Sequence, residues 1–203
     1  MELQQLWREK VIAWLENNVS THRIEHILGV EATCIELAQQ HQVSPKKAAK
    51  AGLLHDLAKF FPPDKLLDFA SKAKIKIDPI CQQHPHLLHA DVSAVVAKEE
   101  FNVKNTQILD AISNHTLGRP KMSPLSCIVY IADTIEPGRG DTPQLNRLRE
   151  IAAKDLYLGV WETSDYALQY LISDRKLIHP RTVATRNWAL KKAKKVHKKS
   201  HLV

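Results

Sequence analysis

The sequence is poor in the residues that tight turns and thiolate metal sites require. It has 6 glycines among 203 residues, which disfavours a loop-rich β architecture. Its 3 cysteines, Cys34, Cys81 and Cys127, lie far apart and include no Cys-x-x-Cys pair. A thiolate zinc site is therefore not expected, and buried free thiols are the simpler interpretation.

Long apolar runs are also absent. No stretch of about 18 apolar residues predicts a transmembrane helix, and the N-terminal MELQQLWREK has no apolar signal core. We therefore expect a cytoplasmic protein with no membrane partner. Hydrophobic residues make up 44% of the chain and charged residues 25%, as in soluble globular proteins, and the length suits one domain with a substantial core.

The positive charge is unevenly distributed. Much of the net charge of +7 lies in the lysine-rich run KKAKKVHKK, residues 191–199. Such a run can bind nucleic acid. It contains no interleaved aromatic residue, however, and a solvated helix end or tail explains it equally well. Nucleic acid is therefore not the partner that we expect.

Helical periodicity runs through nearly the whole sequence, and strand-like alternation is absent. Hydroxyl residues precede prolines at Ser44, Ser123 and Thr142, a signature of helix starts, because the hydroxyl caps free N–H groups and proline fits the first position. We predict an all-α fold. Its expected parts are a packed N-terminal helix in 1–19, a helical domain over 20–190 and a basic tail or helix end over 191–203. The predicted helices are 2–17, 21–41, 45–58, 64–72, 85–100, 104–116, 123–135, 143–154, 155–173 and 180–197.

Two carboxylates lie inside apolar helical runs. Asp56 follows His55 in AGLLHDLA, residues 51–58, and Asp133 lies in IVYIADTIE. An unpaired carboxylate is costly in a protein core, so each of them needs a partner. A metal ion is the leading candidate, and a buried ion pair with Lys59 or an arginine is the alternative.

Three further histidines accompany apolar helical runs: His26 in RIEHILGV, His89 in HLLHADVSAVV and His115 in AISNHTLGR. Each one alone is better explained as a core histidine that is hydrogen-bonded to a carbonyl or a side chain. His22 and His26, four residues apart, could also hold one metal from one helix face.

Taken together, these residues follow one another in the order of the HD-domain superfamily, a group of all-helical metal-dependent phosphohydrolases: His26, His55, Asp56, His89, His115 and Asp133. The words HRIEHILGV, HDLAKF, LLHADV, HTLGRP and ADTIEPGR resemble one branch, the YqeK-type proteins, which are mostly bacterial symmetrical hydrolases of diadenosine tetraphosphate. The resemblance covers about residues 20–190. The chain departs from it at Ser93, where the family often has glycine, and at Thr134, where it often has tyrosine.

The resemblance implies a single HD-domain helical bundle with two divalent or mixed-valence metal ions, iron in this family. The ligands that it assigns to the first ion are His26, His55, Asp56 and Asp133, and those of the second are His89 and His115, with Asp56 bridging. Imidazoles and carboxylates also suit Mn, Co or Zn. Two ions about 4 Å apart can activate water and clamp a phosphate oxygen.

Basic residues near these motifs are candidates for holding a polyphosphate. Lys59 follows the first motif, Arg119 lies in HTLGR, and Arg139 lies in EPGRG, where Gly138 exposes backbone N–H groups. Arg23 is a further candidate. An ordinary surface charge is the alternative for each of these residues.

The expected reaction is metal-dependent splitting of diadenosine tetraphosphate into two ADP. Asp56 and Lys59 are the expected catalytic residues: the carboxylate offers two oxygens to two metals, and the ammonium stabilises charge on phosphate oxygens. The substrate follows from the resemblance. The residues by themselves leave open a nucleotidase or a cyclic-nucleotide phosphodiesterase, and also a non-catalytic RNA-binding module. The sequence also leaves the oligomeric state open.

Overall fold

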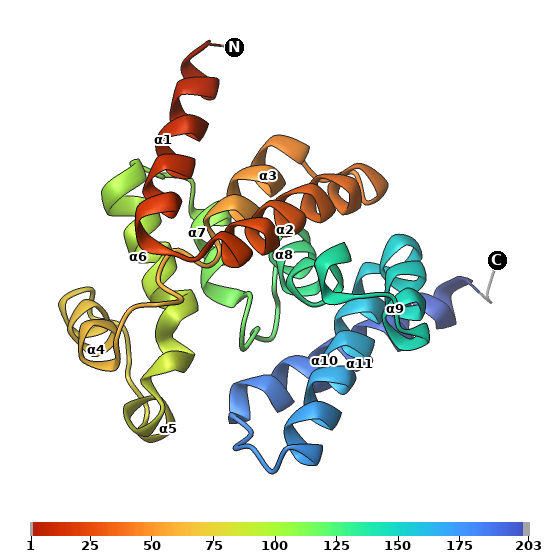
Figure 1. Ribbon diagram of the computed structural model, residues 1–203. Helices are drawn as coiled ribbons and strands as arrows, with labels where there is room; N and C mark the ends of the chain where they lie inside the picture. Colours follow the sequence, from red (N-terminus) through yellow and green to blue (C-terminus); the bar gives the residue numbers. More distant parts are fainter. Residues whose placement is uncertain (1, 201–203) are drawn as a thin grey trace.

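The computed structural model describes residues 2–200, with side chains described for residues 5–194. The predicted all-α fold is confirmed: no strand occurs among residues 2–200 (Figure 1). The α-helices are α1 (Glu2–Asn18), α2 (Thr21–Gln40), α3 (Pro45–Leu54), α4 (Pro63–Lys72), α5 (Pro79–Gln83), α6 (His89–Phe101), α7 (Thr106–Asn114), α8 (Pro124–Ile135), α9 (Pro143–Lys154), α10 (Leu156–Ser173) and α11 (Pro180–Ser200). Two short 3₁₀ helices are η1 (Pro85–Leu88) and η2 (Pro137–Arg139).

The predicted hydroxyl–proline helix starts are confirmed. The side chains of Ser44, Ser123 and Thr142 each accept a hydrogen bond from the backbone N–H three residues later, and proline occupies the first position of α3, α8 and α9. These caps satisfy N–H groups that a helix leaves free at its start. The sequence thereby fixes where the helices that carry much of the candidate site begin.

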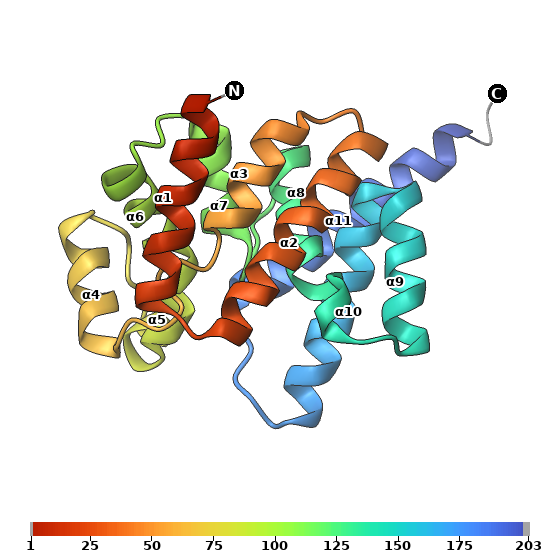
Figure 2. The same cartoon turned by 45° about the horizontal axis from the view of Figure 1, so that its top comes forward.

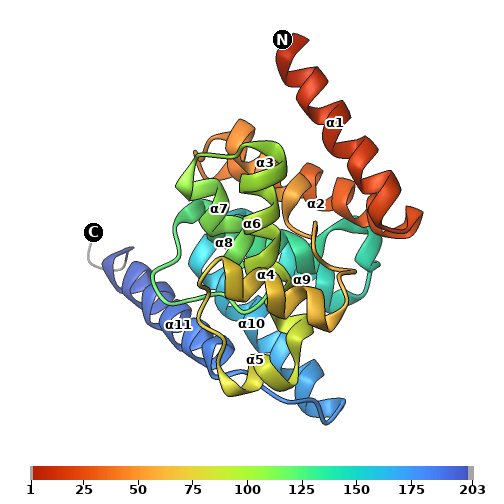
Figure 3. The same cartoon turned by 90° about the vertical axis from the view of Figure 1, so that its left-hand side faces the viewer.

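The centre of the molecule is formed by α2, α3, α7 and α8, which pack on one another (Figure 1). Helices α4, α5 and α6 lie on one side of them, and α9, α10 and α11 lie on the other (Figure 2). Helix α1 lies on the outside of this bundle, with its N-terminal end pointing away from it (Figure 3). Buried Val11 and Leu15, together with the edge-on rings of Trp14 and Phe101, attach α1 to the domain.

The helix bounds differ from the prediction where polar residues reach the interior. Helix α3 ends at Leu54 rather than 58, and residues 55–60 form turns. The predicted helix over 85–100 is divided into η1 and α6 at His89, and the short α5 was not predicted. The hydroxyl of buried Ser93 accepts a hydrogen bond from the backbone N–H of Ala58 at 2.9 Å, which fixes the turn after α3 against α6.

The C-terminal lysine-rich run continues α11 without a break up to Ser200, and residues 201–203 lie outside the described part of the chain. Ala189 and Ala193 are fully buried, so this part of the helix packs on the domain. Within residues 2–200, no helix has the length and apolar character needed to span a membrane.

Candidate metal centre

The turn that follows α3 carries His55 and Asp56 into the protein interior. His55 is fully buried and Asp56 is 2% exposed. The prediction that both lie within a helix was wrong, because α3 has ended before them. Because the helix ends here, both side chains turn toward the helices that pack on α3. In a continuous helix, two adjacent side chains would point in different directions.

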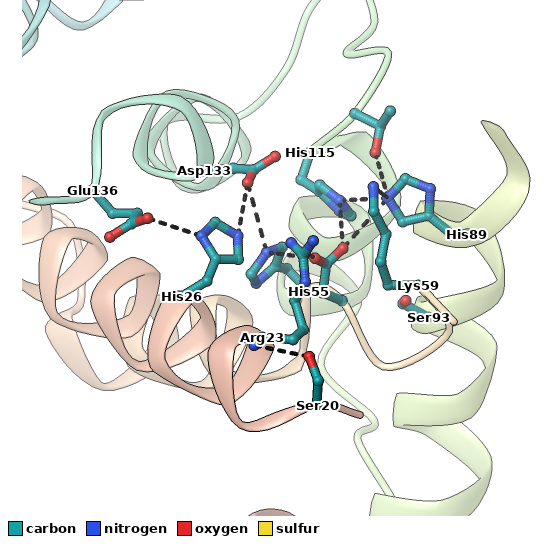
Figure 4. Close-up of polar contacts among 12 residues, drawn as sticks. Ser20, Arg23, His26, His55, Lys59, His89, Ser93, His115, Asp133 and Glu136 are labelled. Carbon is teal, nitrogen blue, oxygen red and sulfur yellow. Dashed lines mark hydrogen bonds and ion pairs between the residues drawn. The ribbon is translucent and has the colours of Figure 1, made fainter. Parts of the chain in front are cut away.

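Each of four other elements brings one predicted ligand to the same place. His26 comes from α2, His89 from the first position of α6, His115 from the residue after α7, and Asp133 from α8. The three histidines are buried, and the Asp133 side chain is 24% exposed. In Figure 4 the imidazoles form a row that runs from His26 to His89.

Asp56 lies between two groups of imidazole nitrogens. Its Oδ1 is 3.4 Å from Nε2 of both His89 and His115, and its Oδ2 is 3.6 Å from Nε2 of His55. Asp133 Oδ1 lies 3.1 Å from His26 Nε2 and 3.9 Å from His55 Nε2. Overlapping three-residue groups here have ligand atoms close enough to share an ion. The carboxylate of Asp56 is thus placed where a bridge would lie.

The four histidines all present the same nitrogen to the centre. Nδ1 of His55, His89 and His115 lies 2.7, 2.6 and 2.9 Å from the carbonyl oxygens of Gly52, His86 and Ile112, and Nδ1 of His26 lies 3.0 Å from the Glu136 carboxylate. Because these oxygens can only accept, each Nδ1 carries a proton and each neutral ring keeps a lone pair on Nε2. This is the tautomer that binding of a metal through Nε2 requires.

Two observations show that the centre suits a cation. His89 Nε2 and His115 Nε2 lie 3.1 Å apart with their lone pairs facing each other, within the spacing of about 3.0–3.4 Å for two imidazoles on one ion at ordinary metal–nitrogen lengths. His55 Nε2 and Asp56 Oδ1 are buried without a hydrogen-bond partner. Buried polar atoms are rarely left in that state, so a bound ion would resolve both features.

The protonation states agree with this interpretation. Burial lowers the pKa of His55 to about 4 and also lowers the pKa of His89, so both rings are neutral at pH 7. Burial opposes ionisation of Asp56, but the surrounding imidazoles of His55, His115 and His89 hold its pKa well below the usual range. Asp133 is likewise ionised, since the neighbouring ring of His26 strongly lowers its pKa against the effect of burial. Neutral imidazoles and anionic carboxylates are the ligand forms.

Glu136 is a functional candidate that sequence reasoning missed. It is 2% exposed, and its carboxylate accepts hydrogen bonds from His26 Nδ1 at 3.0 Å and from the Gly138 backbone N–H at 2.6 Å. Gly29 makes room for it, because a Cβ there would lie 2.5 Å from Glu136 Oε2. The available signal was a carboxylate three residues after Asp133, at the end of the same apolar run. Its position fixes the orientation and tautomer of His26.

We predict that Glu136→Gln weakens metal binding at the first position about ten- to a hundredfold. The amide would place an NH₂ group against one of the two N–H donors that the carboxylate now accepts from. Metal titration of the folded variant measures this effect. Glu25→Gln is the matched control, since the Glu25 side chain is 72% exposed. Equal metal affinities in the wild type and Glu136→Gln would contradict the assigned role.

Three of the predicted basic residues reach the centre. Arg23 Nη1 lies 3.0 Å from Asp56 Oδ2, and Arg139 Nη2 lies 2.7 Å from Asp133 Oδ1. Lys59 Nζ lies 3.3 Å from Nε2 of His89. Arg23 and Arg139 also line a cavity of about 330 Å³ beside His26, so their guanidinium groups stand between the carboxylates and solvent.

The other predicted binding groups are engaged elsewhere. Arg119 forms an ion pair with Asp110 at 3.1 Å, and both side chains are about half exposed. The Gly138 N–H donates to Glu136 instead of facing open space. The side chain of His22 is 89% exposed, and its closest charged partner is Glu25, so the structure does not bring it to His26 as a second ligand.

A larger cavity of about 890 Å³ opens onto the centre. His115, Asp133 and Lys59 line one end, and its other walls come from η1, α10 and the α10–α11 loop. A volume in this range accommodates ligands of nucleotide size. Sequence reasoning did not assign these outer walls, because their residues are far apart in the chain and have no common motif.

A separate trio, Asp78, Cys81 and His179, also has closely spaced ligand atoms. His179 Nδ1 accepts a hydrogen bond from the Arg181 backbone N–H at 3.0 Å, so the ring proton lies on Nε2, which donates to Asp78 at 2.8 Å. This is the opposite tautomer from that of the four central histidines. The trio therefore fits a hydrogen-bonded link between α5 and the start of α11 better than a metal site.

An all-helical domain that gathers four imidazoles and two carboxylates beside a nucleotide-sized cavity defines a protein of the metal-dependent phosphohydrolase class. A family model described as HD domain matches residues 23–138. The chain belongs to the HD domain family.

Relatives of known name point to one branch. The chain is 34% identical over 181 residues to a protein of Bacillus subtilis named symmetrical bis(5'-nucleosyl)-tetraphosphatase, covering 89% of this chain and 96% of that protein. A protein of the same name from Halalkalibacterium halodurans is 32% identical, with 90% and 97% covered. A crystal structure from Clostridium acetobutylicum, described as a predicted HD superfamily hydrolase involved in NAD metabolism, has a TM-score of 0.86 and 32% identity, with 91% and 97% covered.

Proposed function

We propose that this protein hydrolyses dinucleoside tetraphosphates symmetrically and splits diadenosine tetraphosphate into two ADP. The observation that carries the proposal is Asp56, whose two oxygens face two sets of imidazole Nε2 atoms beside a cavity large enough for a nucleotide. The names of the relatives that match over most of their length support the same activity. The chain is therefore an enzyme, a metal-dependent phosphoanhydride hydrolase.

Two metal ions are part of the proposal. The residues that would hold the first are His26, His55, Asp56 and Asp133, and those that would hold the second are Asp56, His89 and His115. Iron is the ion that the family resemblance implies, and the donor set suits Mn, Co or Zn as well. Such ions, when bound, supply an activated water and positive charge for a phosphate oxygen.

The remaining chemistry belongs to side chains of this chain. Lys59 lies beside His89 at the centre and can stabilise charge on a phosphate oxygen. Arg23 and Arg139 pair with the carboxylates of Asp56 and Asp133. A metal ion bound to those carboxylates would weaken their ion pairs with the two arginines. The guanidinium groups would then be free to bind phosphate oxygens. The leaving group is ADP, a stable anion that needs little protonation.

Metal analysis together with product identification tests this function. The purified enzyme should contain metal and convert diadenosine tetraphosphate to two ADP. Inorganic phosphate as the product would indicate a nucleotidase, and a linear nucleotide formed from a cyclic one would indicate a phosphodiesterase. A metal-free chain that binds RNA with a steep dependence on salt would instead support a non-catalytic module.

We predict that Arg139→Ala lowers kcat/KM for diadenosine tetraphosphate about ten- to a hundredfold, because a charge-assisted hydrogen bond to phosphate is lost. Metal content should not change, since arginine is no ligand. Arg139→Lys should recover part of the rate, because an ammonium makes no bidentate pair. Arg147→Ala, at a side chain 69% exposed, is the control. Equal losses on the tetraphosphate and on an aryl phosphate would assign Arg139 to support of the centre instead.

A further inference from the structure

The lining of the cavity of about 890 Å³ is basic and polar beside the metal centre and partly apolar farther from it. Lys59, His84 and His86 line it on the side of η1, beside the candidate ligands. The α10–α11 side presents Tyr170 and Leu177, two of the larger exposed apolar side chains of the described residues, 52% and 48% exposed. Cationic groups at one end of the cavity suit an anionic part of a ligand. An aromatic ring with aliphatic neighbours at the other end suits a flat apolar part of the same ligand.

We propose that this cavity binds one nucleoside diphosphate half of the substrate, with the ring of Tyr170 as the stacking surface for the purine base. The inference rests on the proposed function and adds to it the site of one base. An aromatic side chain that is half exposed inside a cavity offers a flat apolar surface, and stacking of a base on such a ring needs no base-specific hydrogen bond.

The charges of the cavity favour the phosphates. Lys59, Arg175 and Lys176 line it, whereas Asp133 is the acidic residue among its lining residues and also serves as a candidate metal ligand. His84 and His86 add two more groups that can donate hydrogen bonds, with their rings 5.9 Å apart. A diphosphate that extends from the metal centre would therefore meet mainly donors, although Lys176 is shared with the Asp174 carboxylate at 3.1 Å.

The proposed stacking ring is held in place by its neighbours. Lys176 Nζ lies 2.6 Å from the Tyr170 hydroxyl and 4.5 Å from the centre of its ring. The hydrogen bond between His179 and Asp78 ties the start of α11 to α5, so the loop that carries Lys176 is anchored at its far end. An ordered ring costs little conformational entropy when a base binds to it.

Calorimetric binding to the metal-loaded enzyme tests the proposal with two probes, ADP and tripolyphosphate. Tyr170→Leu should weaken ADP binding about tenfold, in the range that loss of one base–aromatic contact produces. Its affinity for tripolyphosphate, which has no base, should stay within about twofold of the wild type. Tyr170→Phe should bind ADP within about threefold of the wild type, because it keeps the ring surface and loses only the hydroxyl contact with Lys176. Ile172→Ala, at an exposed position of α10 outside the cavity lining, is the matched control.

Two results would overturn the proposal: unchanged ADP affinity in Tyr170→Leu, or an equal loss of affinity for tripolyphosphate. The second would mean that Tyr170 supports the shape of the cavity. Failure of the proposed function looks different. In that case the wild-type enzyme would release no ADP from diadenosine tetraphosphate, while Tyr170→Leu would still weaken binding of ADP and not of tripolyphosphate. That result would support the base site and contradict the proposed reaction.

Discussion

Asp56→Ala should abolish hydrolysis and remove at least one metal ion. Its Oδ1 faces His89 and His115 while its Oδ2 faces His55, so both candidate positions lose the same carboxylate. Removing a group on which both ions depend should lower kcat by about a thousandfold or more. Metal analysis and turnover of diadenosine tetraphosphate, measured on the same preparation, check this result.

Two comparisons make the Asp56 experiment specific. Asp110→Ala removes a carboxylate that is half exposed and paired with Arg119, and it should leave turnover and metal content unchanged. Asp56→Asn keeps the shape of the side chain and removes its charge, so it should fail nearly as severely if the carboxylate acts as a bridge. An Asp56→Ala enzyme with the turnover of the wild type would disprove the arrangement with two metals.

The sequence predicts the fold because helix formation depends on local patterns. Hydroxyl–proline pairs and apolar stripes are read from neighbouring residues, and α3, α8 and α9 begin where they were expected. The helix ends near the centre were less predictable. Residues 45–58 have a helical pattern throughout, but the contacts of His55 and Asp56 with other helices favour turns from residue 55 onward. Tertiary contacts override local propensity at such points.

The gathering of the candidate ligands could be anticipated only through the resemblance. Nothing local to His26 or His115 distinguishes a ligand from an ordinary core histidine, since the decisive features are the hydrogen bond on Nδ1 and the direction of Nε2. Arg119 shows a different case: its proximity to a motif suggested a role in binding phosphate, its half-exposed side chain pairs with Asp110, and the role stays a prediction. Glu136 was missed because its partners, Gly29 and His26, lie on another helix.

His89→Ala and His115→Ala should each eliminate nearly all activity while the protein keeps its fold and one metal ion. Both rings face the Oδ1 side of Asp56, and their Nε2 atoms lie 3.1 Å apart. Loss of one ring removes a ligand of the second position and leaves Asp133 and His26 at the first position in place. Since both variants affect the same ion, the double variant should be little worse than either single one.

Metal stoichiometry, turnover and thermal unfolding of each variant together decide the assignment of His89 and His115. His22→Ala controls for loss of an imidazole, because that side chain is 89% exposed and lies outside the centre. The assigned roles require that one equivalent of metal is lost along with the rate. If both variants retain the full metal content of the wild type and lose only thermal stability, the facing lone pairs of His89 and His115 belong to a structural contact, and the second metal position must lie elsewhere.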